Sequence, residues 1–251
     1  DSKKVCVIVE GEDDYRLFSP LLLENVEIFQ SYSSCTGVDN IVQHHFLGYK
    51  RVIGIRDRDY LSEPVNDQCF FCDYCCAEMM IIAVDQCFDR LFANTFSKNG
   101  PMNSDKVRLH CLERLEKLSK LRKMSCLLGW NIKFDGIKPA NYYKNDIGAM
   151  NSDIVKKLNL INPNNQIDAD RQRICDDLPK CTSLSEYLQI TNGHDFVNLF
   201  CKVATVMSGQ VAIKTIETAL RTTFSIGDFK RTNLYNDLHK YQVDNNIRIV
   251  E

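Results

Sequence analysis

The sequence predicts an α/β protein with a parallel sheet flanked by helices, followed by a mostly helical half. Two observations lead to this prediction. Over roughly the first 95 residues, short β-rich apolar runs alternate with segments of helical periodicity, a pattern typical of a parallel sheet with helices on both sides. Beyond that point the β-rich runs stop and helical periodicity continues almost to the end of the chain, so the second half is expected to be helical.

Four strands are expected in the first half. Each is a short run rich in branched and aromatic side chains, and the runs cover residues 3–9, 26–32, 51–55 and 69–75. Apolar side chains recur three or four positions apart in the segments between and after these runs. Those segments predict helices over residues 12–24, 38–47 and 77–93.

A polar linker, SKNGPMNS, follows the first half. Ser104 is expected to cap a helix that runs to Gly129, a residue type common just past helix ends. Further helices are expected over residues 152–158, 168–178, 195–207, 211–223 and 227–241. We therefore expect two domains, a sheet domain over residues 1–97 and a helical domain over residues 98–251.

The helical domain offers a candidate surface for a partner or for dimerisation. Tyr235, Leu238 and Tyr241 follow one another at three-residue spacing near the end of the chain, so they share one face of a helix. If this domain binds a partner or a second copy of the chain, these side chains are expected to form an exposed apolar stripe.

Composition limits the classes of function. The chain has 251 residues and a formal net charge of −2, so any binding of nucleic acid must depend on a local basic patch. The sequence shows neither an apolar stretch long enough to cross a bilayer nor a secretory signal at its start. We therefore expect a cytoplasmic protein, not bound to membranes, whose twelve cysteines are reduced.

Four of the cysteines lie close together in the sequence. Cys69, Cys72, Cys75 and Cys76 have the spacing of a zinc or iron–sulfur ligand run. The alternative is that they pack as small buried side chains. Packing is favoured because a zinc site normally needs a second ligand pair at a turn, and the sequence shows none apart from Cys87.

Two acidic motifs follow apolar runs of the predicted sheet. Glu10 comes directly after the first run, and Asp57 and Asp59 follow the third. If these strands are neighbours in a parallel sheet, the three side chains meet at its carboxyl edge, where open α/β sheets bind ligands. Clustered carboxylates repel one another unless a cation lies between them, and oxygen ligands favour Mg²⁺ or Mn²⁺. An extended backbone would point both aspartates to the same side.

Two further acids extend this candidate metal site. Asp14 lies one helical turn after Glu10, near the positive end of the predicted helix. Glu78 begins the helix after the fourth strand, next to an apolar run where an unpaired charge is unfavourable. Either motif alone is common in solvated turns. Together, at the ends of successive strands, they favour a metal site.

Other polar residues allow two interpretations. The predicted helix over residues 104–128 carries seven basic side chains against three acids, which fits a solvated face or a phosphate-binding ridge. His194 precedes a helix together with Asp195; capping or packing is favoured over catalysis because no pattern relates it to the sheet edge.

These motifs resemble a known family. Glu10-Gly11-x-x-Asp14, followed by Asp57-x-Asp59 after a β-α-β-α-β path, resembles the toprim domains of topoisomerases, primases and OLD-family nucleases. The rest of the chain resembles one toprim branch, the DUF4435 family, whose members end in a helical half. That resemblance is carried by three segments: YCCAE at residues 74–78, TNGHD at residues 191–195 and FKRTNLY at residues 229–235.

The resemblance implies a toprim-like fold and a metal-dependent endonuclease. Some members of this branch are effectors of the PARIS anti-phage system. In that system an ABC-type ATPase holds the effector until it is released, and the free effector then cuts tRNA. It implies tRNA or other RNA as the substrate in preference to DNA, and an ABC-type ATPase as the partner. It implies Mg²⁺ or Mn²⁺ as the cofactor and catalytic roles for Glu10, Asp57 and Asp59, with Asp14 and Glu78 as further metal ligands. The alternative is a non-catalytic toprim module that binds metal or nucleotide and docks on an ATPase.

Overall fold

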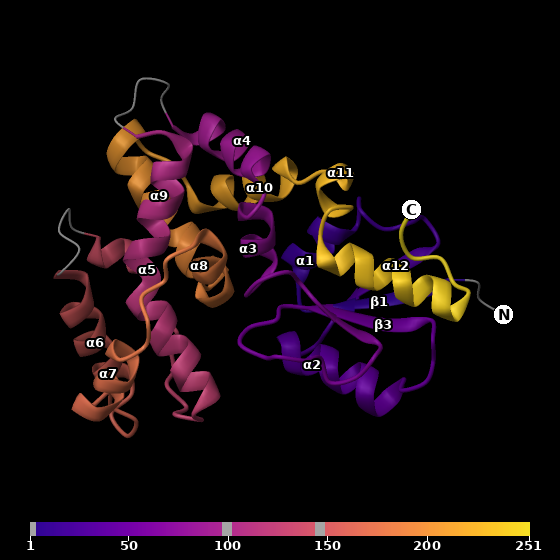
Figure 1. Cartoon of the computed structure of the whole chain (residues 1–251), viewed down its shortest axis with the longest axis horizontal. Helices are drawn as coiled ribbons and strands as arrows, with labels where there is room; N and C mark the ends of the chain where they lie inside the picture. Colours follow the sequence, from indigo (N-terminus) through magenta and orange to yellow (C-terminus); the bar gives the residue numbers. More distant parts are fainter. Residues whose placement is uncertain (1–3, 97–101, 144–148) are drawn as a thin grey trace. The chain divides into compact units, whose positions relative to one another are not determined.

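The computed structural model describes residues 4–96, 102–143 and 149–251, and the chain forms two compact units (Figure 1). The sheet unit combines the chain up to Val84 with Arg221–Glu251, and the helical unit is Asp85–Leu220. This division differs from the expected one at residue 97 in two respects. The helix after Val84 belongs to the helical unit, and the last segment of the chain returns to the sheet unit.

The predicted parallel sheet is confirmed. Its strands are β1 (Val5–Val9), β2 (Val26–Gln30), β3 (Val52–Arg56) and β4 (Cys69–Phe71), in the order β2-β1-β3-β4. All neighbours are parallel, and Val7 of β1 pairs with Ile28 of β2 and Ile53 of β3. β4 is shorter than expected.

Helices cover both faces of the sheet, as expected. The helices of this unit are α1 (Glu12–Phe18), α2 (Ser34–Asn40), the π-helical turn η1 (Ile41–His45), α3 (Ala77–Ile82), α11 (Ile226–Phe229) and α12 (Asn233–Asn245). Figure 1 shows α2 and α12 on opposite sides of the strands. On the α2 side, Val38 and Val42 pack against Ile8 and Cys69. Gly54 of β3 lets α2 approach, because a Cβ there would lie 2.6 Å from Val38 Cγ1.

The opposite face is covered by the end of the chain. The ring of Tyr241 meets Phe70 of β4 edge to face at 5.3 Å, and Leu238 is fully buried. Tyr235 packs against Phe229. The expectation that Tyr235, Leu238 and Tyr241 form an exposed stripe is therefore wrong, because the sheet unit uses this helix face for its own core.

A buried carboxylate fixes the start of α12. Asp73, which is 9% exposed, follows β4. Its two oxygens accept hydrogen bonds from the backbone N–H groups of Asn233 and Leu234, each at 2.9 Å. A carboxylate at a helix N-terminus satisfies donors that have no partner within the helix. This contact ties the end of the chain to the sheet.

Local signals explain where helices end earlier than the periodicity predicts. α1 stops at Phe18, not residue 24, because Pro20 has no backbone N–H to continue the helical hydrogen bonds after Ser19. The helix expected over residues 77–93 is interrupted where Val84 N–H binds Ile81 O at 3.1 Å, a tighter closure than an α-helical turn. The helix expected over residues 227–241 restarts at Thr232, whose hydroxyl caps α12.

The helical unit is organised around one long helix. Its helices are α4 (Asp85–Thr95), α5 (Ser104–Leu127), the 3₁₀ turn η2 (Pro139–Tyr142), α6 (Ala149–Ile161), α7 (Ala169–Asp176), α8 (Leu184–Ile190), α9 (Gly193–Ser208) and α10 (Ile213–Thr223), the last of which crosses the division at Leu220. α5 packs against α4, α6, α7, α8 and α9. Its cap is Asn103 instead of the expected Ser104, and Gly129 follows its end with φ +61°.

Within the described ranges, no single helix has the length and apolar character needed to cross a membrane. α9 and α10 meet that test only when counted together, as a pair bent by 107°.

The close approach of α2 to β3 can be tested at Gly54. In Gly54→Ala the new methyl group would overlap Val38, which is fully buried. We expect the free energy of unfolding to fall by about 1–3 kcal/mol, the usual cost of overpacking. Urea denaturation measures this. Gly227→Ala is the matched control, since its Cβ meets only Ser225 Oγ at 3.7 Å; equal stability losses in the two variants would contradict the prediction.

Candidate metal centre

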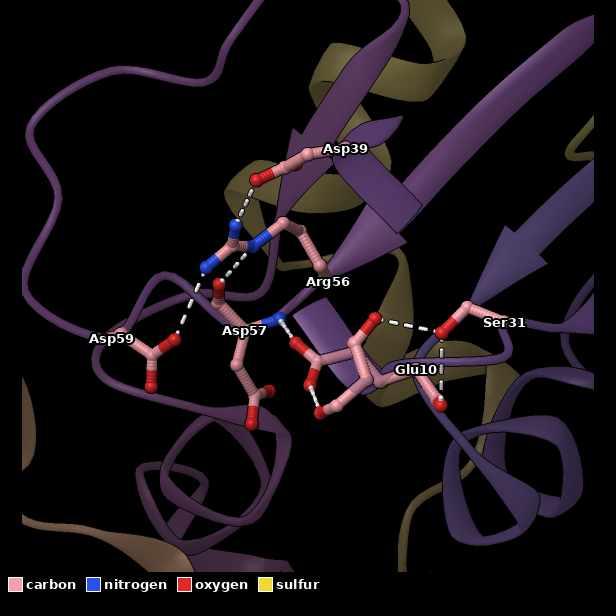
Figure 2. A network of polar contacts seen from close by, with 7 residues as sticks. Glu10, Ser31, Asp39, Arg56, Asp57 and Asp59 are labelled. Atoms are coloured by element: carbon pink, nitrogen blue, oxygen red, sulfur yellow. Dashed lines mark hydrogen bonds and ion pairs between the residues drawn. The ribbon is translucent and has the colours of Figure 1, made fainter. Parts of the chain in front are cut away.

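The carboxyl ends of β1 and β3 bring two predicted residues together. Glu10 directly follows β1 and Asp57 directly follows β3, and these strands are parallel neighbours. The backbone N–H of Asp57 donates a hydrogen bond to Glu10 Oε1 at 2.9 Å (Figure 2). On the other oxygen, the Ser34 hydroxyl donates to Glu10 Oε2 at 2.7 Å. Glu10 is thus held at the sheet edge by two donors.

The Asp57 carboxylate lies beside the start of α3. Its Oδ1 accepts a hydrogen bond from Ala77 N–H at 2.9 Å, which draws the first turn of this helix to the end of β3. As a result, one ligand atom from each of Asp57, Cys76 and Glu78 lies within 4.8 Å of the other two. Among the described residues, Asp57 Oδ2 and the Glu78 carboxylate accept no hydrogen bond from the protein and are open to a cation.

Asp14 completes a group of four carboxyls. In the first turn of α1, its Oδ2 accepts a hydrogen bond from Gly11 N–H at 3.1 Å. Burial, then the charges of Glu10 and Glu78, raise the pKa of Asp14 to about 7, although the Gly11 hydrogen bond opposes this shift. Asp14 therefore lies within electrostatic reach of the other acids.

The same repulsion acts on Asp57. Burial raises the pKa of Asp57 well above its ordinary range, and the charges of Glu78, Glu10 and Asp14 add to that rise. Since each acid makes its neighbours harder to ionise, a divalent cation at this place would relieve both burial and repulsion. The residues present therefore fit a metal ion.

Asp59 has a different environment from the other predicted ligands. Its Oδ2 lies 3.1 Å from Arg56 Nη2, and the same guanidinium forms an ion pair with Asp39. Figure 2 shows Arg56 between Asp39 and Asp59. The expected extended backbone over Asp57–Asp59 is wrong, because Asp59 has a left-handed φ of +51°. The turn directs its carboxylate to the buried Arg56 cation.

The pKa of Asp59 reflects both influences. Burial and the charge of Glu10 raise it, while the Arg56 guanidinium acts in the opposite direction. Arg56 is only 5% exposed, and its Nε also donates to Asp57 O at 2.9 Å. Arg56 therefore neutralises the charges of Asp39 and Asp59 and fixes the turn between Asp57 and Asp59.

The sequence prediction missed Arg56, Asp39 and Ser34, and it considered Cys76 only as part of an all-cysteine ligand run. One available signal was the charge of Arg56 at the end of an otherwise apolar strand, directly before two acids. Such a charge is rarely buried without a partner. No short motif identifies Ser34, because its contact with Glu10 joins residues on different strand connections.

Arg58, between the two aspartates, belongs to a separate cavity. This cavity of about 640 Å³ is lined by Arg58, Phe70, Asp237 and Lys240, and none of the four clustered acids contributes to its wall. The Arg58 guanidinium stacks over the ring of Phe71 at 5.1 Å. Its lining mixes aromatic side chains with charged ones of both signs and gives no reason to assign this cavity to the metal chemistry.

The cysteines behave mostly as expected. All twelve are free thiols, and Cys69 packs in the apolar cluster beneath α2. In the part of the chain that the structure describes, the four-cysteine segment forms no all-thiol site, and Cys76 alone joins Asp57 and Glu78. Cys126 is exposed.

The basic helix is only partly a solvated face, because Lys106 and Lys117 are exposed whereas Arg108, Arg114 and Lys120 are buried. Its role as a phosphate-binding ridge stays a prediction. Several of its cations are buried in ion pairs within the helical unit: Arg108 with Asp85 and Asp105, Lys120 with Glu116, and Arg122 with both oxygens of Asp195. His194 opens α9 in the same unit.

Comparisons with protein-family models, curated proteins and solved structures find no match to this chain. The resemblance to toprim proteins therefore rests on the sequence motifs alone.

The role of Arg56 can be measured through stability. Arg56→Met would leave Asp39 without its cation, and Asp39 Oδ1 is already buried without a hydrogen-bond partner in the described structure. We expect a loss of about 3–5 kcal/mol in unfolding free energy, the usual cost of breaking a buried ion pair. Adding Asp39→Asn should recover part of the loss in urea denaturation. A double variant less stable than Arg56→Met would show that the stranded charge is not the cause.

Stability should also depend on pH through Asp14. Its ordinary pKa is 3.8 and its folded value is about 7, so the folded protein binds more protons between these values. Without metal, the unfolding free energy therefore falls as pH rises from about 4 to 7, by up to about 4 kcal/mol from this group. Cations compete with these protons, so Mn²⁺ should raise the melting temperature more at pH 8 than at pH 5.

Thermal denaturation with Mn²⁺ or with a chelator measures this difference. Asp14→Asn should reduce the pH dependence, whereas Glu24→Gln, which removes an exposed carboxyl of the same unit, should not. A Mn²⁺ effect as large at pH 5 as at pH 8 would contradict the assignment.

Proposed function

We propose that the sheet unit is a divalent-metal-dependent phosphodiesterase that acts on nucleic acid. The observation that carries this proposal is the group of four carboxyls, Glu10, Asp14, Asp57 and Glu78, which follow the ends of three strands. Repulsion between these carboxylates destabilises the fold by itself. Enzymes that hydrolyse phosphodiesters use clustered carboxylates to hold Mg²⁺ or Mn²⁺.

The protein residues have separable roles. Asp57 and Glu78 would contact the cation directly, since their oxygens are open, and Glu10 and Asp14 would complete the negative field. Backbone donors at Asp57 and Ala77 hold Glu10 and Asp57 in fixed orientations, which limits the reorganisation needed on binding. The bound cation would supply a hydroxide nucleophile near neutral pH and offset the charge of the phosphate.

Asp59 and Arg56 would act together at the outer side of the centre. While Asp59 contacts Arg56, it holds the turn instead of a cation. Asp59 stays among the proposed catalytic residues because the Asp57-x-Asp59 motif carries the toprim resemblance.

The toprim resemblance supports the finer parts of the proposal. It favours tRNA over DNA as substrate, an anti-phage role in the cytoplasm, and control by an ABC-type ATPase. With a net charge of −2, substrate affinity must come from local cations and from the bound metal. Because Leu238 and Tyr241 are buried and Tyr235 packs against Phe229, a partner would bind another surface.

Catalysis can be tested with Glu10→Gln. Glutamine keeps the size of the side chain and an oxygen for the Asp57 N–H, but it removes the charge. We expect normal folding by circular dichroism and a fall of at least about 100-fold in cleavage of total tRNA with Mg²⁺ or Mn²⁺. Glu12→Gln is the matched control, because Glu12 lies two residues away, exposed and paired with Arg16.

Two outcomes would contradict the nuclease proposal. Equal cleavage by Glu10→Gln and the parent would place the activity elsewhere or in a contaminant. If the parent cuts neither RNA nor plasmid DNA with either cation, the non-catalytic toprim module that binds metal or nucleotide becomes the better proposal.

A further inference from the structure

The carboxylate centre contains a sulfur atom. Cys76 Sγ lies within 4.8 Å of a carboxylate oxygen of Asp57 and of Glu78, and those two oxygens lie equally close to each other. Three atoms so spaced are at most about 2.8 Å from a common centre, whereas zinc–oxygen and zinc–sulfur bonds are about 2.0–2.3 Å long. Shifts of about half an ångström would therefore place all three around one ion.

The thiol of Cys76 has no capping function that would explain its position. Cys76 is the N-cap residue of α3, a position that favours Ser, Thr, Asp or Asn because their oxygens bind the first backbone N–H groups. The Cys76 side chain makes no such hydrogen bond. The Ala77 N–H instead binds Asp57, and the thiol lies beside the two carboxylates.

We propose that Asp57, Cys76 and Glu78 form a site for a thiophilic divalent metal of the zinc type. Thiolate ligands select zinc-like ions, while Mg²⁺ binds oxygen almost exclusively. Three protein ligands leave a fourth position for water, the arrangement of catalytic rather than structural zinc sites. Binding replaces the thiol proton, so each metal bound by Cys76 releases one proton to solvent.

A catalytic role for this site rests on the proposed metal-dependent function. The inference also adds a zinc-like ion to the expected Mg²⁺ or Mn²⁺. One cation position of the centre, beside α3, would hold a zinc-like ion. The oxygens of Glu10 and Asp14 would remain for a harder ion such as Mg²⁺ or Mn²⁺. A centre with two unlike positions explains why a cysteine occurs among the acids.

Cobalt provides a direct optical test on the full-length chain. Co²⁺ replaces Zn²⁺ in such sites, and a thiolate ligand gives a charge-transfer absorption band in the near ultraviolet. After removal of metals with a chelator, Co²⁺ titration of the parent should produce this band at one equivalent, and Zn²⁺ should abolish it. Cys76→Ser should lose the band. Its affinity for Zn²⁺ should fall by more than about 100-fold, a larger loss than is usual when a residue that only contacts a metal ligand is removed.

Matched variants distinguish Cys76 from the other thiols. Cys126→Ala removes the exposed cysteine that could bind cobalt without a formed site, and it should keep the band. Cys76→Ser should leave Mg²⁺ binding nearly unchanged, because Mg²⁺ does not use sulfur. A band that survives in Cys76→Ser, or that disappears in Cys126→Ala, would overturn the proposal.

A measurement on the parent protein covers the case in which Cys76→Ser does not fold. X-ray absorption at the zinc edge should show one sulfur at about 2.3 Å among oxygen neighbours. A spectrum with oxygen or nitrogen neighbours alone would overturn the site.

The test separates this inference from the nuclease proposal. Cleavage with Mg²⁺ in the absence of any cobalt–thiolate band would leave the nuclease and reject the thiolate site. A band that depends on Cys76, in a protein that cuts no nucleic acid with any metal, would leave the site and reject the nuclease.

Discussion

The parallel pairing of β1 with β3 is the constraint on which the candidate site depends. It places the residues after both strands at the same edge of the sheet, so Glu10 accepts a hydrogen bond from the backbone of Asp57. An antiparallel arrangement would put these acids at opposite edges. The remaining parts of the centre follow from this pair, because α1 starts after Glu10 with Asp14, and Asp57 holds the N-terminus of α3 with Glu78.

Charge is distributed unevenly around this edge. Glu10, Asp14, Asp57 and Glu78 lie within electrostatic reach of one another, and burial together with this repulsion raises the pKa values of Asp14 and Asp57. On the other side of the same turn, Arg56 neutralises Asp39 and Asp59. Arg56 therefore holds the turn at Asp59, whereas the carboxylates of the metal centre have, among the described residues, no basic partner and can bind a cation. The thiol of Cys76 lies beside Asp57 and Glu78, and its sulfur favours a zinc-like cation at that position.

The helical unit and the chain end show a different use of polar groups. In α5, cations that look solvated in the sequence are neutralised within the unit, as with Arg122 and Asp195. In the sheet unit, Asp73 holds the first turn of α12. Both carboxylates connect segments far apart in the sequence. They stabilise the tertiary arrangement through hydrogen bonds that leave no buried charge unsatisfied.

The sequence by itself determined the parallel sheet, its four strands and the edge at which Glu10 and Asp57 meet, because apolar runs and the alternation of strand and helix are local signals. It also indicated Asp14 and Glu78 through their places at helix starts. Only the tertiary structure decided that Asp59 pairs with Arg56, that Ser34 and Cys76 join the centre, and that α12 returns to the sheet. Those outcomes depend on contacts between distant residues and on a left-handed turn at Asp59, and neither periodicity nor motif spacing carries that information.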